Sequence, residues 1–345
     1  MTIKDKYRYS ERDKFVSLLA KQDFHEVMAA VKGEAFREYR RQWDCAGRFE
    51  LETPVPLHCD FEFSTGCNLR CSMCPHGMPR QARPAGFDRV SGRFPFELFR
   101  KVIDEGVPLG LRAIDLSYYN EPLLRDDLPE FIEYAGSHGI LDILCSTNAQ
   151  LLDAEWTERL LDTPLTRLKV SLDADNSETY AAIRSGGDFG AAVGNLERFI
   201  RRKAERGQVL PITRVSFVKT RLNEHELDGF LARWTGLADY VCVQELIEFD
   251  EMKVDLTPAS RIVNRDFRCH HPWHQLTFRV DGQALPCCTI WGQQIPVGNV
   301  AEQSLAEIWT GPAMKALRRL HREGRYQENP VCLKCAKSSV AGQGD

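Results

Sequence analysis

The chain has 345 residues, with 43% hydrophobic and 27% charged side chains and a formal net charge of −4. These proportions are those of an ordinary globular protein, and the weak negative charge gives no electrostatic reason to bind nucleic acid or an anionic membrane. No apolar run approaches the roughly 18 residues that a membrane span needs, and the highly charged first residues lack the pattern of a signal peptide. We therefore expect a cytoplasmic protein with neither nucleic acid nor a membrane as its partner.

The chain is predicted to begin with two or three amphipathic helices, because residues 10–44 carry apolar side chains at helical spacing. From residue 57 onward, strand-like and helix-like segments alternate. The predicted strands are 57–63, 111–118, 140–147, 166–172, 212–219 and 239–246. The predicted helices are 94–106, 127–139, 153–162 (with Asp153 as N-cap), 177–184, 189–206 and 223–234. This alternation is typical of parallel βα units in an α/β fold, in which chemistry gathers at the carboxyl ends of the strands.

The sequence pattern changes near residue 265. Residues 269–288 predict a loop and two strands joined by a turn at Asp281-Gly282. A helical segment follows at 304–324, and the chain then carries the pair of cysteines in CLKC (332–335), which we expect on a tight turn. We therefore divide the chain into an N-terminal helical extension (1–50), a barrel-like domain (51–250) and a small C-terminal domain (251–345).

Three of the twelve cysteines stand together after the first predicted strand, in the segment CNLRCSMC at 67–74. In a reducing compartment, clustered cysteines are more often metal ligands than disulfides. A structural zinc ion takes four protein ligands, and His76 is the residue that could supply the fourth, so zinc is the weaker interpretation. Three thiolates on a four-iron cluster would leave one iron open to an outside ligand, which a catalytic metal site requires.

The spacing Cx3Cx2C after a first strand resembles the signature of the radical S-adenosylmethionine (SAM) superfamily. The resemblance implies a partial (βα)6 TIM-like barrel in which Cys67, Cys71 and Cys74 bind a [4Fe–4S] cluster. In that family, the amino and carboxylate groups of SAM chelate the fourth iron, and an electron from the reduced cluster cleaves SAM to methionine and a 5′-deoxyadenosyl radical. A flavodoxin or a ferredoxin-type protein is the expected electron donor.

Further segments resemble the SAM-binding motifs of the family. The residue before the last cysteine, commonly aromatic there, is Met73, whose polarizable thioether could cover an adenine. In LSYYNEPLL (116–124), Glu121 corresponds to a carboxylate that accepts a hydrogen bond from the SAM ammonium. Tyr119 and Asn120 replace the two glycines of that motif, so the expectation is carried over for Glu121 alone.

The next strands continue the resemblance. STNAQLL (146–152) corresponds to a Thr-Asn-Gly turn, with Ala149 in place of the glycine. In KVSLDADNSETYAAIRSG (169–186), Ser171 is expected to face the SAM ribose or carboxylate, and Arg184 to pair with the carboxylate. Val218 and Asn223 are the candidates for contact with the adenine.

A second set of cysteines, Cys269, Cys287, Cys332 and Cys335, follows the barrel. Spacing alone leaves structural zinc and an iron–sulfur cluster both open. Residues 269–335 resemble the SPASM-type auxiliary domain in its shortened "twitch" form, as in the radical SAM dehydrogenase of butirosin biosynthesis. That implies one auxiliary [4Fe–4S] cluster, fully ligated by four cysteines. Since Cys288 is adjacent to Cys287, the sequence does not decide which of the two is the ligand.

The resemblance implies a radical SAM oxidoreductase for a small or carbohydrate-like metabolite, whose substrate radical loses a proton and passes an electron to the auxiliary cluster. Glu245 and Glu248 are the candidates for the base. Cys145 and Cys242 are candidates for a thiol that returns a hydrogen atom in an epimerase. The alternatives are a SPASM-type peptide-modifying maturase, a radical epimerase and, from another class, a non-catalytic zinc-binding scaffold.

Overall fold

The computed structural model describes residues 8–9, 16–20, 23–88, 90–247, 255–258 and 269–340. The strands are β1 (Arg8–Tyr9), β2 (Val16–Ala20), β3 (His58–Phe61), β4 (Ala113–Asp115), β5 (Asp142–Thr147), β6 (Arg167–Ser171), β7 (Ile212–Lys219), β8 (Tyr240–Glu245), β9 (Gln275–Phe278), β10 (Gln283–Leu285) and β11 (Gly298–Asn299). The helices are α1 (Phe24–Lys32), α2 (Glu34–Gly47), α3 (Phe96–Gly106), α4 (Leu128–Ser137), α5 (Ala154–Leu161), α6 (Ser177–Ile183), α7 (Phe189–Glu205), α8 (Leu227–Trp234), α9 (His271–His274), α10 (Leu305–Trp309), α11 (Pro312–Arg322) and α12 (Pro330–Val340).

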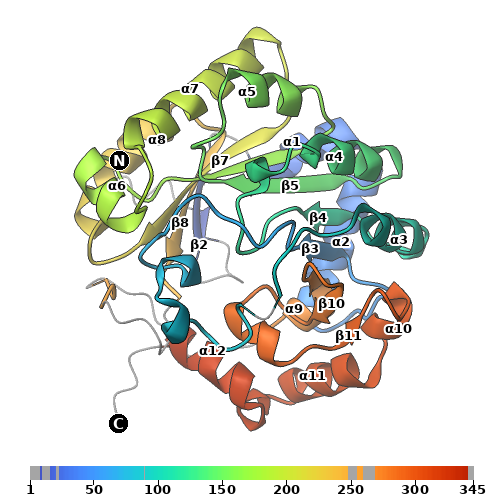
Figure 1. Ribbon diagram of the computed structural model, residues 1–345. Coiled ribbons are helices and arrows are strands. Elements are labelled where there is room, and N and C mark those ends of the chain that lie inside the picture. The colour runs from blue at the N-terminus through green and yellow to red at the C-terminus, as the bar shows by residue number, and fades with distance from the viewer. Residues whose placement is uncertain are drawn as a thin grey trace.

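Six neighbouring parallel strands, β3 to β8, lie in chain order at the centre of one sheet whose full order is β1-β2-β8-β7-β6-β5-β4-β3-β9-β10-β11. Helices follow the parallel strands and lie outside the sheet (Figure 1). The predicted α/β fold with a partial βα barrel is therefore confirmed, and each of the six predicted strands is present. Of the helices that the structure describes, none combines the length and the apolar character needed to cross a bilayer.

The outer face of the sheet is apolar and packs against the helices. Alternate strand residues such as Phe61, Ile114 and Val170 share one buried cluster with residues of α3, α4, α5, α7 and α8. Aromatic rings fill much of it; those of Phe61 and Phe99 meet edge to face with centroids 4.9 Å apart.

The inner face of the same strands is polar, because successive side chains of a strand point to opposite faces. On β3, the imidazole Nε2 of His58 lies 2.8 Å from Asp60 Oδ1. On neighbouring strands, Lys169 donates to Asp115 over 2.5 Å. A barrel that serves only as a packed core fills this face with branched apolar residues. These polar side chains are therefore suited to a polar ligand.

One expectation about the N-terminal extension is wrong. Residues 16–20, predicted within a helix, form β2, which pairs antiparallel with β8 in a register that opposes Ser17 and Val243. The exposed edge of β8 offers a row of backbone hydrogen-bonding groups, and pairing with it outweighs the helical periodicity of a five-residue segment.

The helices of the extension lie where the prediction put them and close the amino end of the barrel. Residues of α1 and α2, including Met28 and Phe36, are buried in one cluster with Leu57, Ala113 and Ile212, which lie at or next to the starts of strands. Asp23 caps α1 by accepting a hydrogen bond from the backbone N–H of His25.

The C-terminal domain continues the barrel sheet. The strand β9 pairs parallel with β3, and β10 and β11 extend the sheet beyond it. The final pair of cysteines lies in the first two turns of α12, and not on a tight turn as predicted. Asn329 caps this helix, with its side-chain oxygen accepting from the backbone N–H of Val331 and Cys332. Because residues i and i+3 share a helix face, Cys332 and Cys335 still lie together.

We predict that Asp142→Asn lowers the free energy of unfolding by about 3 kcal/mol, because it leaves the guanidinium of Arg167 without its buried partner. Asp142 is 1% exposed and accepts from Arg167 Nε at 2.9 Å and from Thr166 Oγ1 at 2.8 Å. Burial by itself would raise the pKa of Asp142, but the charge and hydrogen bonds of Arg167 outweigh it and hold that pKa below its ordinary value.

The contribution of Asp142 is therefore complete above the ordinary carboxyl pKa and is lost as the pH falls through the lowered one. Urea unfolding followed by circular dichroism from pH 7 to pH 3 measures the difference, which should shrink in acid. The matched control is Glu34→Gln, which removes an exposed ion pair with Arg41 and should leave stability nearly unchanged. A loss for Asp142→Asn no larger than that of the control would contradict the prediction.

Candidate active site

The three clustered cysteines line one pocket of about 240 Å³ at the carboxyl end of the strands. The cysteine loop is held by backbone hydrogen bonds to the end of α6, from Arg70 N to Ser185 O at 2.9 Å and from Ser72 N to Ile183 O at 2.8 Å. Gly77 packs so tightly on the loop that a Cβ there would lie 2.2 Å from the carbonyl oxygen of Cys71. The loop is thus fixed by contacts that are far apart in sequence.

The environment of the thiols suits metal ligation. Burial raises the pKa of all three, that of Cys74 to about 12, so the free thiols are protonated at neutral pH and metal binding has to displace their protons. Arg184 Nη1 lies 3.8 Å from Cys71 Sγ. A guanidinium in this position stabilises the thiolate form of Cys71 and the negative charge of a bound cluster.

The pocket offers three thiols as metal ligands, and no fourth side chain of the described residues is placed to join them. His76 lines the pocket, but its Nε2 lies 2.7 Å from the carbonyl oxygen of Tyr119, and the ring packs edge-on against Phe87. The zinc interpretation that used His76 as fourth ligand is therefore not supported. Among the described residues, no group of three or more His, Cys, Asp or Glu side chains is spaced to hold a single metal ion. Three thiols around one pocket fit a [4Fe–4S] cluster with one open iron.

Glu121 is placed by the loop after β4 at the wall of the same pocket. Its carboxylate is 2% exposed and accepts hydrogen bonds from Thr147 Oγ1 at 2.6 Å, from Asn148 N at 2.8 Å and from Leu123 N at 3.2 Å. Burial raises its pKa to about 7 although these bonds oppose the shift. An ammonium group in the pocket would find in Glu121 an acceptor that is already oriented.

Ser171 and Arg184 both line the pocket, as expected for side chains near a SAM carboxylate. Arg184 is oriented by Asp173, which accepts from its Nε at 2.8 Å and forms an ion pair with its Nη2. Sequence reasoning gave Asp173 no role, although it belongs to the Ser-x-Asp segment. It is fully buried with a left-handed backbone at φ +60°, and its Oδ1 accepts from Val218 N at 2.7 Å.

Of the remaining candidates for contact with SAM, some line the pocket and others do not. Met73 lines the pocket. Asn223 is fully buried and donates to the carbonyl oxygens of Asp173 and Val218, at 2.8 and 2.9 Å. Neither Val218 nor Asn223 is among the residues that line the pocket. Their observed contacts fix the ends of β6 and β7.

Other pocket residues were missed by sequence reasoning. They lie at the carboxyl ends of β4 and β5, in the segments 116–124 and 146–152, whose resemblance to family motifs was a signal for the segment but not for these individual side chains. They are Ser117, Tyr118, Tyr119, Asn120, Ser146, Thr147 and Asn148.

The four candidates for proton or hydrogen transfer do not come together. Glu245 shares the outer face of β8 with Val241 and Val243 and pairs with Lys219 at 2.7 Å. Cys145 belongs to the apolar cluster under the helices. Cys242 is buried on the inner face, where its register partner on β7 is Ser216, itself paired with Ser171. Glu248 lies outside the described residues. Of the four, Cys242 is the one whose register places it level with the pocket.

The second set of cysteines forms a separate group. Burial raises the pKa of Cys269 well above its ordinary range, and the neighbouring thiols of Cys287, Cys335 and Cys332 raise it further. These residues come from the segment before α9, the end of β10 and the helix α12. Gly292 makes room for the group, because a Cβ there would lie 2.8 Å from Cys287 Sγ. The four thiols that this electrostatic influence connects are the number that a fully ligated cluster needs.

The structure separates Cys287 from Cys288. Cys287 acts on the pKa of both Cys269 and Cys332. Cys288, by contrast, is not among the main causes of the pKa shift of either thiol. Cys287 is therefore the residue placed to complete the four-thiol group.

An apolar and aromatic bridge joins the two thiol groups. Met78 and Phe87 from the cysteine loop pack in one cluster with Ile290 and Trp291 of the C-terminal domain, and Cys335 contacts that cluster. Tyr119 also packs against it; burial raises the pKa of its hydroxyl, and the thiols of Cys74, Cys288 and Cys287 raise it further. The two groups thus face each other across packed protein.

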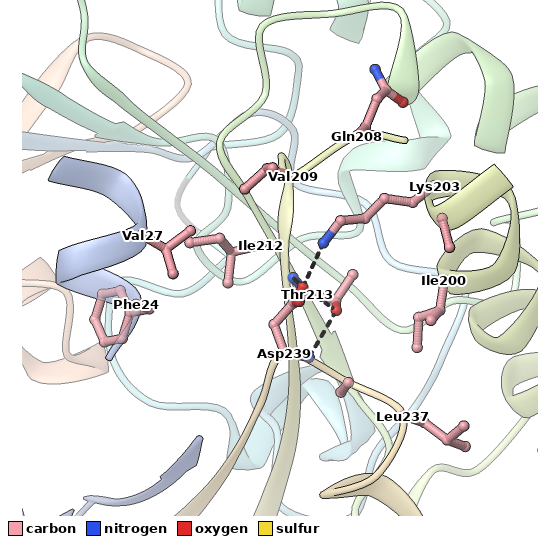
Figure 2. A pocket seen from close by; sticks show the side chains of 12 residues that line it. Phe24, Val27, Ile200, Lys203, Gln208, Val209, Ile212, Thr213, Leu237 and Asp239 are labelled. Carbon is pink, nitrogen blue, oxygen red and sulfur yellow. Dashed lines mark hydrogen bonds and ion pairs between the residues drawn. The ribbon is translucent and has the colours of Figure 1, made fainter. Parts of the chain in front are cut away.

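Another pocket, of about 380 Å³, lies between α1 and α7 at the amino ends of β7 and β8 (Figure 2). Its charged groups neutralise one another, because Asp239 accepts from Lys203 at 2.6 Å and from Thr213 Oγ1 at 2.7 Å. It is at the opposite end of the strands from the clustered cysteines, so it is not a part of the site described above.

A family model described as the radical SAM superfamily matches residues 61–231, and one described as an iron-sulfur cluster-binding domain, SPASM, matches residues 269–336. The chain belongs to the radical SAM superfamily. It carries a C-terminal SPASM domain, and the resemblance noted in its sequence is thereby confirmed. The radical SAM domain implies SAM and a [4Fe–4S] cluster as cofactors, and the SPASM domain implies additional iron–sulfur clusters.

Curated relatives perform different reactions. The chain is 29% identical to the probable GTP 3′,8-cyclase of Methanococcus maripaludis (strain C5) over 201 residues, which are 55% of this chain and 58% of that protein. It is 29% identical over 189 residues to the mycofactocin maturase MftC of Mycobacterium ulcerans, covering 54% of this chain and 46% of the maturase. The chain thus spans less than two thirds of these relatives.

Among solved structures, BtrN in complex with AdoMet and 2-DOIA superposes with a TM-score of 0.53 and 16% sequence identity, over 84% of this chain and 96% of BtrN. At this identity the likeness shows a shared fold of barrel and C-terminal domain.

We predict that Cys287→Ala reduces the iron content after anaerobic reconstitution from about eight to about four irons per chain, because the four-thiol group loses a ligand. Cys288→Ala, the matched control from the adjacent position, should retain about eight. Iron determination together with absorbance near 400 nm measures both. Loss of four irons in Cys288→Ala, with Cys287→Ala unaffected, would reverse the assignment.

Proposed function

We propose that this radical SAM enzyme is an oxidoreductase that removes two electrons from a small polar metabolite. The observation that carries the proposal is the second group of four thiols, held apart from the three-thiol pocket and joined to it by the packed bridge around Tyr119. A fully ligated cluster has no open iron for SAM, so its use is electron transfer.

When bound, the cofactors supply a 5′-deoxyadenosyl radical that removes a hydrogen atom and an auxiliary cluster that accepts an electron. The side chains of the protein would hold the clusters and orient SAM. Cys67, Cys71 and Cys74 would ligate the first cluster, while Glu121 would accept the SAM ammonium and Arg184, beside Ser171, would face its carboxylate. Met73 would cover the adenine.

Oxidation also requires that the substrate lose a proton. Each of Asp115 and Glu245 has one buried carboxylate oxygen with no hydrogen-bond partner among the described atoms, but Asp115 supports this role better because it is on the inner face of the barrel. Its Oδ2 accepts from Lys169. The reducing electron for SAM cleavage would come from a flavodoxin or ferredoxin-type partner.

A second candidate function is modification of a peptide. It is favoured by the 29% identity to a protein named as the mycofactocin maturase. The polar inner face of the barrel, which offers charged groups in place of an apolar surface, favours the small polar metabolite.

Cys332→Ala is expected to retain reductive SAM cleavage while product formation falls at least 100-fold, because it removes a ligand of the electron-accepting cluster. Cys71→Ala should abolish both, since it removes a ligand of the SAM-binding cluster. Liquid chromatography with mass detection measures 5′-deoxyadenosine and product under anaerobic conditions. Cys45→Ala, which removes a thiol on α2 away from both groups, is the matched control. Unchanged product formation by Cys332→Ala would refute the electron-acceptor role.

Deuterium transfer identifies the substrate class. A deuterated polar metabolite that is the substrate should yield 5′-deoxyadenosine enriched by one mass unit, because the abstracted hydrogen atom remains on that product. A parallel experiment offers deuterated peptides to the same reconstituted enzyme and tests the maturase alternative. Enrichment from a peptide and from no metabolite would replace the oxidoreductase proposal by the maturase one.

A further inference from the structure

Arg214 is a cation on the inner face of β7. Its neighbours in the sheet register are Lys169 on β6 and Tyr240 on β8. The adjacent residue Val215 points the other way, into the apolar cluster under the helices. Arg214 is partly exposed, so its guanidinium is not sealed within the protein.

The partners of Arg214 are neutral. Its Nε donates to Ser216 Oγ at 2.9 Å, and its Nη2 donates to Gln244 Oε1 at 3.0 Å. Of the five N–H groups of a guanidinium, these bonds use two. Within the described ranges no carboxylate oxygen forms an ion pair with Arg214, whereas Lys169 is paired with Asp115.

The surroundings of Arg214 leave its charge uncompensated. Burial lowers its pKa, and Cys242, Tyr240 and Asp115 act in the other direction strongly enough to keep it above the ordinary value. A thiol and a phenol are neutral at pH 7. Arg214 bonds only neutral side-chain groups and has N–H groups left over, so an anion bound on the inner face would compensate its charge and accept those N–H groups.

The position of Arg214 connects it to the reaction centre. Ser216, which orients the guanidinium, is the register partner of Ser171, and Ser171 lines the pocket of the clustered cysteines. Arg214 is two residues closer to the amino end of β7 than Ser216. A ligand that reaches Arg214 therefore lies one layer beneath the SAM pocket, within the inner face of the barrel.

We propose that the inner face binds the substrate through an anionic group, a carboxylate or a phosphate, held by Arg214. The free N–H groups of the guanidinium form the fork that such oxyanions accept. Asp115 Oδ1, buried without a partner among the described atoms, accepts a hydroxyl or ammonium donor of the same molecule. The identification of this ligand as the substrate rests on the proposed function. The binding of an anion by Arg214 does not depend on it.

The test is an anaerobic calorimetric titration of the reconstituted enzyme, saturated with SAM so that the carboxylate of the cofactor does not compete. Inorganic phosphate and propionate are the two probes, and propionamide is the uncharged control. We expect saturable binding of one anion in the millimolar range and none of propionamide. Phosphate binding identifies a phosphorylated substrate, and propionate binding identifies a carboxylic acid.

In Arg214→Gln the anion should bind at least tenfold more weakly, because hydrogen bonds from a charged group are lost. Arg214→Lys keeps the positive charge but lacks the paired N–H donors of the guanidinium, so it should bind the anion with intermediate affinity. This variant also tests the proposal if the glutamine variant does not fold. Arg201→Gln, which changes an exposed arginine of α7, is the control and should bind as the unaltered enzyme does.

The proposal is overturned if neither anion binds the unaltered enzyme, or if the variants at Arg214 bind it as tightly. No radical is generated in these titrations. Absence of SAM cleavage in a separate assay with dithionite would therefore refute the proposed function and leave the anion site standing.

Discussion

The ion pair between Asp173 and Arg184 is the interaction on which the site depends. Asp173 also accepts from the backbone of Val218, and its own carbonyl accepts from Asn223, so it ties the ends of β6 and β7 together. Arg184 extends the connection to the thiol of Cys71. Since Asp173 is fully buried, loss of either charge would leave the other without its partner in a region of low dielectric. The geometry of the cysteine loop is thus coupled to the barrel and not set by the loop alone.

A second constraint is the contact between the two groups of thiols. In the loop that leads to Glu121, Tyr119 packs against the cluster that contains Ile290 and Trp291 and so fills the space toward the C-terminal domain. Tyr118 reinforces the contact by donating its hydroxyl to the carbonyl oxygen of Thr289 at 3.0 Å. Because β9 also pairs with β3, the C-terminal domain is joined to the barrel both by backbone hydrogen bonds and by aromatic packing. The distance between the two thiol groups is thereby fixed, as the proposed electron transfer would require.

The polar inner face links fold and chemistry. Its charged residues mostly neutralise one another, with Asp60 bonded to His58, Gln275 and Thr277, and Arg214 as the cation left with neutral partners. A face of this kind holds a small polar molecule by directed bonds. The different reactions named for the relatives agree with a fold on which the side chains of the site, and not the fold itself, set the function.

The amino-acid sequence by itself determined the βα alternation, the Cx3Cx2C loop and the four-cysteine set, because strand and helix periodicity and ligand spacing are local properties of the chain. It also placed Met73, Glu121, Ser171 and Arg184 on one pocket through the order of their motifs. The tertiary structure decided what depends on distant partners. Residues 16–20 became a strand because the edge of β8 was open, and the final cysteine pair became helical because Asn329 caps α12. Cys287 differs from Cys288, and Arg214 from the other arginines, in the side chains that lie next to them in the folded protein. The spacing of residues in the sequence does not contain that information.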